Sequence, residues 1–166
     1  MNFPFGKNAK LFALATLVFA AVFSASVAVR AHQSAGGSAQ SHGIVTPDGL
    51  KWGPLIPGSQ MAVVSGDPSQ SGPFVIRIKS VAGAVIPAHW HPTDENVTLL
   101  EGTFAVGMGD KFDATKLTTM HPGDFISMPA TMHHFAKSEG SIVQVHGMGP
   151  FQVNFVNPAD DPRTKQ

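Results

Sequence analysis

Three residues in one short stretch of the chain have side chains that could bind a metal ion together. The stretch runs from Gly83 to Gly102 and reads GAVIPAHWHPTDENVTLLEG. His89 and His91 are two residues apart, so in an extended chain both imidazoles leave the same face of a strand. Neutral imidazoles and a carboxylate, here Glu95, form a donor set that divalent Fe, Mn, Ni, Cu or Zn accepts. The stretch therefore predicts a metal site.

The residues between His91 and Glu95 predict a turn that joins two strands. Pro92, Thr93 and Asp94 are all residues that favour turns, and they would carry the chain back into a second strand over residues 95–100. The imidazoles and the carboxylate would then converge from adjacent strands. Asp94 stays open as an alternative to Glu95, because a shift of one residue in this strand would exchange their roles.

The spacing of this stretch resembles the first signature motif of the cupin family. That motif consists of Gly, five residues, His-x-His, three residues, Glu, six residues and Gly, and the sequence matches every fixed position. The second cupin motif consists of Gly, five residues, Pro-x-Gly, two residues, His, three residues and Asn. Gly123, Pro129 and His134 stand at three of its fixed positions. The resemblance thus implies that His134 joins His89, His91 and Glu95 as a fourth metal ligand.

Two positions of the second motif depart from the cupin pattern. Thr131 stands where glycine normally eases a tight turn with positive φ, and Ser138 stands where asparagine is expected. β-Branched residues resist positive φ, so the sequence alone does not give the geometry of the turn at Thr131. The register of His134 is unaffected.

The chain after residue 43 has the pattern of an all-β domain. Glycine and proline recur about every eight to twelve residues between short runs rich in Val, Ile, Phe and Thr, which is typical of a sandwich or barrel. In Phe74, Ile76 and Ile78 the apolar residues alternate with polar ones, which predicts one buried face. Trp52, Pro54 and Pro57 indicate a leading segment that wraps the barrel without forming a strand. The predicted strands are residues 61–65, 74–80, 85–91, 95–100, 103–108, 116–120, 124–128, 133–137, 141–146 and 152–156.

The cupin resemblance gives this all-β domain a specific architecture. It implies a single jelly-roll barrel, also described as a double-stranded β-helix, and we assign this barrel to residues 44–156. The matching residues run from Phe74 to about Val156. Residues 44–73 are compatible with the barrel but carry no motif.

Residues 1–31 have the composition of a secretory signal peptide. Lys7 and Lys10 precede an apolar run over residues 11–29, and small residues end at Ala28 and at Ala31, where a signal peptidase could cleave. We therefore predict a periplasmic or secreted protein with no membrane attachment after cleavage. The apolar run also has the length of a membrane-spanning helix, which needs about 20 residues, so an uncleaved anchor stays open as an alternative.

The remaining composition limits the classes of function. Residues 32–43 are small and polar, which indicates a flexible linker, and residues 157–166 indicate a polar C-terminal tail that frays. The chain has no cysteine, so no disulfide framework holds it. Eleven basic and eleven acidic residues give a formal net charge of zero, without a basic run outside the predicted signal. Neither nucleic acid nor an acidic membrane surface is predicted as a partner.

The donor set predicts an open site. A structural zinc site usually closes with four ligands and commonly includes cysteine, whereas four ligands on a metal that prefers six leave positions for a small molecule. The resemblance implies a divalent transition metal, which could be Fe, Mn, Ni, Cu or Zn. It also implies a metalloenzyme of oxygenase, decarboxylase or isomerase type acting on a small molecule, with dioxygenase-like chemistry favoured. A non-catalytic exported protein that binds a small ligand or metal is the alternative.

The chain offers few candidates for the acid and base groups of such a reaction, since it has no tyrosine. Gln144 and His146 are two apart on a predicted strand and would both face either the barrel interior or solvent. His133 adjoins the proposed ligand and should point to the opposite face, and Glu101 is a further candidate base. A homodimer formed through edge strands is also predicted. Apolar residues that could line a pocket are Trp90, Phe104, Val106, Met108, Phe125, Met128, Met132, Phe135 and Phe151.

Overall fold

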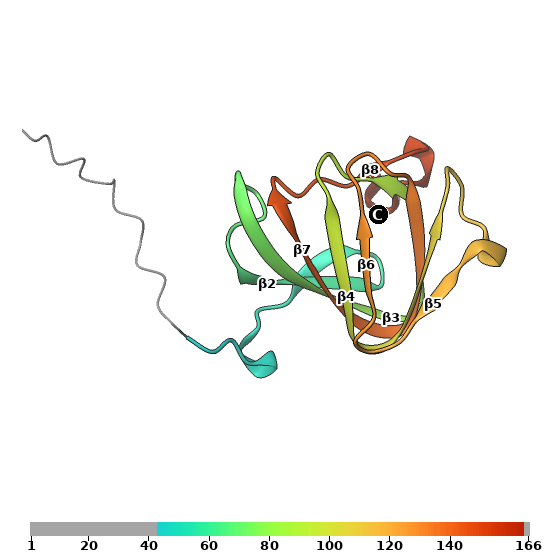
Figure 1. Cartoon of the computed structure of the whole chain (residues 1–166). Helices are drawn as coiled ribbons and strands as arrows, with labels where there is room; N and C mark the ends of the chain where they lie inside the picture. Colours follow the sequence, from blue (N-terminus) through green and yellow to red (C-terminus); the bar gives the residue numbers. More distant parts are fainter. Residues whose placement is uncertain (1–42, 165–166) are drawn as a thin grey trace, which may run out of the picture. The chain divides into compact units, whose positions relative to one another are not determined.

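Three long antiparallel strands carry most of the fold (Figure 1). The computed structural model describes residues 43–164. The predicted signal peptide, residues 1–31, and the predicted linker up to residue 42 lie outside the described residues. Within the described part of the chain, no helix is both long enough and apolar enough to cross a membrane.

The described residues form eight strands and four short 3-10 helices. The strands are β1 (Gly53–Ile56), β2 (Ser59–Ser65), β3 (Gly72–Trp90), β4 (Glu95–Met108), β5 (Thr118–Met120), β6 (Phe125–Met128), β7 (His134–Gly149) and β8 (Asn154–Phe155). The 3-10 helices are η1 (Pro47–Gly49), η2 (Ala114–Lys116), η3 (Pro158–Asp160) and η4 (Pro162–Thr164). The predicted all-β barrel is confirmed.

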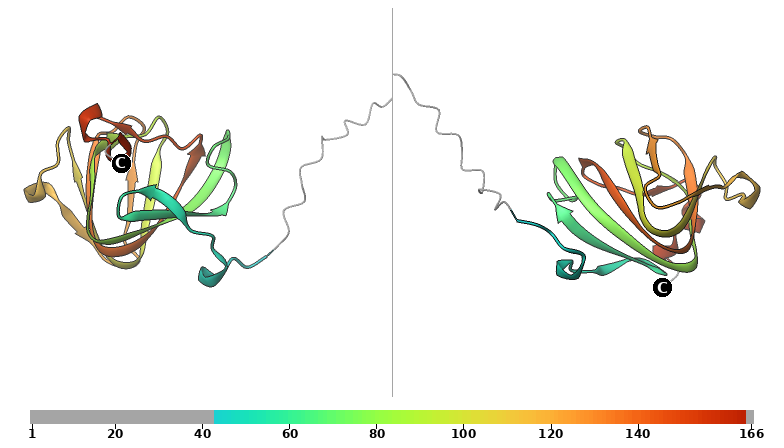
Figure 2. Two further views of the ribbon diagram at one scale, coloured as in Figure 1. Left: turned by 180° about the vertical axis from the view of Figure 1, so that it is seen from behind. Right: turned by 60° about the horizontal axis from the view of Figure 1, so that its bottom comes forward.

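The long strands pass from one layer of the barrel into the other (Figure 2). The first half of β3 pairs with β2 and with the second half of β7, whereas its second half pairs with the first half of β7 and with β8. Strand β4 pairs with β7 along its length, with β6 beside its first half and β5 beside its second. The two layers are therefore β1-β2-β3-β7-β4-β6 and β8-β3-β7-β4-β5, and they share the three long strands.

Glycines with positive φ allow these strands to bend between the layers. Gly83 has a φ of 83°, Gly102 of 77° and Gly140 of 89°, values that side chains disfavour. At Gly102 a Cβ atom would also collide with the carbonyl oxygen of Gly140, so β4 and β7 approach each other too closely there for a side chain. Gly83 and Gly102, the outer positions of the first motif, are therefore the bends at the two ends of the metal-binding stretch.

The core lies between the two layers and follows the predicted alternation. Phe74 and Ile76 are buried and Ile78 packs against them, while Arg77 and Lys79 on the other face are more exposed. On β4 and β7 the inward-facing side chains change between odd and even residue numbers at the glycine bends, as from Val97 to Phe104 on β4 and from Ala136 to Val143 on β7. The buried residues of the main cluster are Phe74, Ile76, Val97, Leu99, Phe104, Val106, Met120, Met128, Ala136, Val143 and Val145.

Several predicted boundaries were wrong. The segment around Pro54 is strand β1, paired with β2, and does not merely wrap the barrel. Six of the predicted strands fuse in pairs into β3, β4 and β7, because a glycine bend changes the direction of a strand without ending its hydrogen-bonded ladder. The predicted frayed tail is folded as far as residue 164: Asn157 caps η3, and Arg163 pairs with Asp161.

Candidate metal centre

A β-bulge near the end of β3 turns His89 into the barrel. Ile86 pairs with Ala136 and His89 pairs with His134, so three steps on β3 match two on β7. This extra residue changes the alternation, and Ile86 and His89 therefore both line the interior although they are three residues apart. Pro87 lies inside the bulge, where its missing N–H is tolerated.

The predicted turn after β3 brings His91 and Glu95 to the same place. His91 follows the last residue of β3, and Glu95 is the first residue of β4. Both side chains are buried, with 4% of His91 and 8% of Glu95 exposed. The Oε2 atom of Glu95 lies 3.4 Å from the Nε2 atom of His91. Asp94, the alternative, is exposed and accepts a hydrogen bond from the backbone N–H of Ala130 at 2.8 Å, so it does not reach the interior.

The turn at Thr131 delivers His134 from the second motif. Thr131 has a φ of 65°, so it adopts the left-handed conformation for which the motif normally provides glycine. Its backbone N–H donates to the carbonyl oxygen of His91 at 2.8 Å, which ties the turn to the first motif. His134 then opens β7 opposite His89, and its Nε2 atom lies 3.3 Å from Oε2 of Glu95.

The other departure from the motif, Ser138, supports the bend in β7. Its side chain is fully buried, and its hydroxyl accepts a hydrogen bond from the backbone N–H of Gly140 at 3.1 Å. The same oxygen lies 2.8 Å from the hydroxyl of Ser141. A short hydroxyl side chain therefore stabilises the glycine bend at the position where asparagine was expected.

Backbone carbonyl groups orient all three histidines in the same way. The Nδ1 atom of His89 lies 2.7 Å from the carbonyl oxygen of Pro87, that of His91 lies 2.7 Å from Gln152, and that of His134 lies 2.9 Å from Met132. Because a carbonyl oxygen only accepts, each Nδ1 carries the hydrogen. Each Nε2 atom then has a free lone pair, which is the arrangement of histidines that bind metals.

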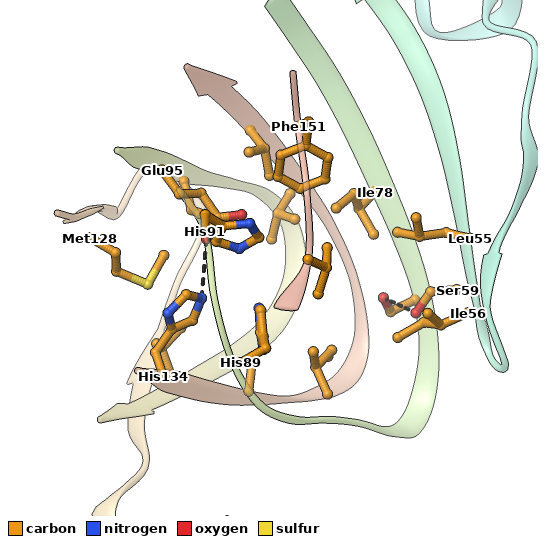
Figure 3. A pocket seen from close by; sticks show the side chains of 18 of the residues that line it. Leu55, Ile56, Ser59, Ile78, His89, His91, Glu95, Met128, His134 and Phe151 are labelled. Atoms are coloured by element: carbon orange, nitrogen blue, oxygen red, sulfur yellow. Dashed lines mark hydrogen bonds and ion pairs between the residues drawn. The ribbon is translucent and has the colours of Figure 1, made fainter. Parts of the chain in front are cut away.

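The three imidazole side chains lie close together on one side of the cavity (Figure 3). Ring nitrogens of His89, His91 and His134 lie within 4.8 Å of one another, and all three side chains are buried. The Nε2 atoms of His91 and His134 have no hydrogen-bond partner among the described residues. A buried polar atom without a partner is costly, and a cation bound at this point would satisfy both.

The distances to Glu95 also fit a shared ion. Two ligand atoms that each lie about 2.1 Å from one cation are about 3.0–3.4 Å apart in octahedral or tetrahedral coordination. The separations between Oε2 of Glu95 and the Nε2 atoms of His91 and His134 are 3.4 Å and 3.3 Å. The three histidines therefore fit a divalent transition metal, and Glu95 lies at a distance suited to an ion shared with His91 and His134.

The protonation states of His89 and Glu95 agree with this set of donors, whereas Glu95 favours a proton on His91 that a bound metal would replace. Burial, together with the neighbouring His134 and His91, lowers the pKa of His89 to about 3 and keeps its imidazole neutral. Burial alone would raise the pKa of Glu95, but its contacts with His134 and His91 outweigh burial and hold it well below the ordinary value. Burial lowers the pKa of His91, yet the carboxylate of Glu95 and the carbonyl of Gln152 raise it overall.

The centre opens into an internal cavity of about 100 Å³ with mostly apolar walls. This volume is enough for a small organic molecule or several waters, since one water needs about 10–15 Å³ on this measure. Of the predicted pocket residues, Phe104, Val106, Met128 and Phe151 line the cavity. The other apolar lining residues are Leu55, Ile56, Ile78, Ile86, Val97, Ala136, Val143, Val145, Val153 and Phe155.

The segment after β7 covers part of this cavity. The ring of Phe151 stacks on His91 with centroids 5.0 Å apart, and that of Phe155 lies 6.0 Å from His89. Arg163 lines the cavity, with its guanidinium 5.2 Å from the ring of Phe155 and paired with Asp161. Sequence reasoning missed Gln152, Phe155 and Arg163 because the segment carries no motif.

The predicted acid and base candidates lie outside the cavity. Gln144 and His146 alternate with Val143 and Val145, which line it, so they point to the outer face. There Gln144 accepts a hydrogen bond from Arg77 at 3.3 Å, and His146 stacks near Phe125 with centroids 6.3 Å apart. Of the two alternatives left open for this pair, the structure therefore shows the outward-facing one.

The two other candidates also face away from the cavity. His133 points away from the centre, as predicted, and its Nδ1 lies 2.7 Å from a carboxylate oxygen of Asp110. Glu101 is exposed. None of the four predicted acid or base groups therefore reaches a ligand in the cavity.

Comparison with known proteins agrees with the geometry. A family model described as a cupin domain matches residues 77–145, which include the four metal-binding candidates. The barrel has the cupin fold. A search of curated proteins found no significant match.

Solved structures share the fold of this barrel. The polyketide cyclase RemF from Streptomyces resistomycificus is 17% identical, with a TM-score of 0.58 over 75% of this chain and 93% of that one. An RmlC-like cupin from Shewanella frigidimarina is 17% identical, with a TM-score of 0.53 over 65% of this chain and 91% of that one. A mutant of oxalate decarboxylase from Bacillus subtilis is 18% identical, with a TM-score of 0.51 over 69% of this chain and 33% of that one. At these identities the likeness concerns the fold alone.

Proposed function

We propose that this barrel binds one divalent transition metal through His89, His91, Glu95 and His134 and acts as an enzyme on a small molecule held in the cavity. The observation that carries the proposal is the convergence of three buried imidazoles, each with its Nδ1 hydrogen on a backbone carbonyl. The donor set accepts Fe, Mn, Ni, Cu or Zn. When bound, such a metal supplies Lewis acidity or the activation of dioxygen.

The chain's own residues limit the chemistry to the centre itself. Glu95 is the only carboxylate among the described residues that line the cavity, and its lowered pKa keeps it ionised. The apolar walls exclude water and strengthen charge interactions at the histidines. An oxygenase, decarboxylase or isomerase reaction suits a site in which the metal and one carboxylate do the work. The names of two structural neighbours, a polyketide cyclase and an oxalate decarboxylase, support a small organic substrate.

A non-catalytic protein that binds a small ligand or metal is the second candidate. The observation that favours it is that no separate carboxylate or histidine among residues 43–164 lines the cavity, because Gln144, His146 and Glu101 lie outside. Such a protein would need the same metal ligands and the same apolar cavity. Turnover alone separates the two candidates.

The location and assembly of the protein are further parts of the proposal. The basic start, apolar run and small residues of segment 1–31 support export to the periplasm or secretion. Fractionation of cells with N-terminal sequencing of the exported form tests this and distinguishes cleavage after Ala28, cleavage after Ala31 and a retained anchor. Light scattering of the purified protein tests the homodimer.

Metal content tests the first part of the proposal. Elemental analysis of the native protein should give one transition metal per chain, and His89→Ala should lose most of it. His121→Ala is the matched control, because its side chain is 76% exposed and is not part of the cavity lining. Equal metal content in the native protein and His89→Ala would contradict the proposal.

Turnover tests the second part. The metal-loaded protein is given phenolic, diketone and small-acid compounds, and oxygen consumption and product formation are measured. An enzyme of the proposed kind converts at least one compound class, and Glu95→Gln abolishes the reaction. Tight retention of a ligand with no conversion of any compound would favour the binding protein.

A further inference from the structure

Two hydroxyl groups lie at the end of the cavity away from the histidines. Ser59 and Ser80 both line the cavity, and each is only 5% exposed. In Figure 3 Ser59 lies beside Leu55 and Ile56, on the opposite side of the cavity from His91 and His134. The cavity therefore has one polar end at the metal centre, a second at the serine pair, and apolar walls between them.

The strand register holds this pair in position. Ser59 is the first residue of β2 and pairs directly with Ser80 of β3, with the two hydroxyl oxygens 2.8 Å apart. Both residues lie on the inward face, which continues along β3 through Ile76 and Ile78. A pair of hydroxyls in place of apolar residues is expensive in such surroundings unless its hydrogen bonds are satisfied.

One hydrogen of the serine pair has no acceptor. Two hydroxyls carry two hydrogens, and the bond between Ser59 and Ser80 uses one of them. No other side chain or carbonyl among the described residues accepts from either hydroxyl. The neighbouring Ser138 does not help, because it donates to the backbone carbonyl of Ser80, at 3.4 Å, and not to the hydroxyl.

We infer that the Ser59–Ser80 pair is the distal part of the ligand site, where its free O–H donates to a carbonyl or hydroxyl oxygen of the bound molecule. The inference rests on the proposed function, since the metal centre holds the other end. The ligand class is then a small, elongated molecule with a metal-binding group such as a carboxylate at one end. The middle of this molecule is apolar, and its far end carries an oxygen atom that accepts the hydrogen bond from the serine pair.

Pairs of probes that differ only in the far oxygen test this subsite. The linear carboxylates from butanoate to octanoate are each compared with the ω-hydroxy acid of the same length, by calorimetry on the metal-loaded protein. At the length that spans the cavity, the hydroxyl should raise the affinity of the native protein about five- to tenfold. The double variant Ser59→Ala and Ser80→Ala should lose this preference and bind both probes alike.

The ratio of affinities within one protein is the readout, so it does not depend on how much of a variant is folded. Ile78→Val is the control, because it changes the cavity wall without touching a hydroxyl and should keep the preference. A preference that survives in the double variant, or that the native protein lacks at every length, would overturn the inference. Metal content is measured on the same samples. A native protein without metal contradicts the proposed function and this inference with it, whereas metal-loaded protein without the preference contradicts the subsite alone.

Discussion

The Nδ1 atom of His91 lies 2.7 Å from the carbonyl oxygen of Gln152, 61 residues further along the chain. This contact joins the metal centre to the segment after β7, and Phe151 adds a ring stacked on the same imidazole. The segment that covers the cavity thus also fixes the tautomer and the orientation of one ligand. Changes in this segment should therefore reach the metal without altering any ligand.

Phe151→Ala is expected to weaken metal binding about tenfold, which is the usual effect of removing a group that orients a ligand. Phe151 also packs against Phe74 with centroids 5.4 Å apart, so unfolding should become easier by about 2 kcal/mol. Competition with a chelator measures the affinity, and denaturant unfolding measures the stability. Phe125→Ala, at an exposed position on the outer face, is the control. Unchanged affinity in Phe151→Ala would show that the stacked ring does not position His91.

Thr131→Gly is expected to stabilise the protein by about 1 kcal/mol. Thr131 has a φ of 65°, and a non-glycine residue held there costs on the order of 1–3 kcal/mol, of which the greater flexibility of unfolded glycine cancels a part. Thr131→Ala is the matched control, since alanine keeps the strain and should give no such gain. Denaturant midpoints of the three proteins compare them directly. A Thr131→Gly protein less stable than the native one would contradict this account of the turn.

Gly102→Ala and Gly83→Ala separate backbone conformation from close contact. Both glycines have nearly the same φ, 77° and 83°, but only at Gly102 would a Cβ collide with another backbone, at Gly140. Gly83→Ala should cost about 1–2 kcal/mol for the left-handed conformation, and Gly102→Ala should cost several kcal/mol more or prevent folding. Thermal unfolding gives both values. Equal losses would mean that β4 and β7 can move apart at the bend.

Acid is expected to destabilise the metal-free protein between about pH 6.5 and pH 3. The pKa of His89 is lowered to about 3 in the folded protein, mainly by burial, so the unfolded chain binds the extra proton first as the pH falls. The free energy of unfolding should fall at up to about 1.4 kcal/mol per pH unit in this range. The lowered pKa of Glu95 adds a further loss of unfolding free energy below pH 4.5, the ordinary pKa of this group. The raised pKa of His91 has the opposite effect, because it stabilises the folded protein at low pH and this stabilisation is lost as the pH rises.

His89→Leu checks the source of this acid sensitivity. Without the buried imidazole, the unfolding free energy should depend less steeply on pH between 6.5 and 3. The comparison uses slopes rather than absolute stabilities, because the substitution also leaves the carbonyl of Pro87 without its partner. Parallel slopes in the two proteins would assign the acid sensitivity to other groups.

The sequence predicted the β-strands and the approach of His89, His91 and Glu95 because these depend on local spacing, whereas His134 was placed only by the cupin resemblance. His89, His91 and Glu95 are close along the chain, and alternation in residues such as Phe74 and Ile76 follows from the geometry of a strand. The structure differs where long-range packing decides. Strict alternation would put Val85 and Pro87 on the face of His89, but the bulge turns Ile86 inward and leaves Val85 42% exposed.

Other features had no local signal. The outward direction of Gln144 and His146 depends on the bend at Gly140, which changes the parity of β7. Ser59 and Ser80 meet only through the register of β2 and β3. Arg163 comes from a polar segment whose composition alone indicated a frayed tail. Each of these placements follows from pairing between distant residues, which a single sequence does not reveal.

The adjacent residues His133 and His134 provide the most direct test of the metal centre. His134 is buried, with its Nε2 atom 3.3 Å from Glu95, whereas His133 points outward and lies 2.7 Å from Asp110. Titration of each alanine variant with Mn²⁺, Fe²⁺, Ni²⁺, Cu²⁺ and Zn²⁺ should show that His133→Ala binds its preferred metal like the native protein. His134→Ala should bind that metal at least a hundredfold more weakly. Equal affinity in His134→Ala and His133→Ala would contradict the metal centre proposed for this barrel.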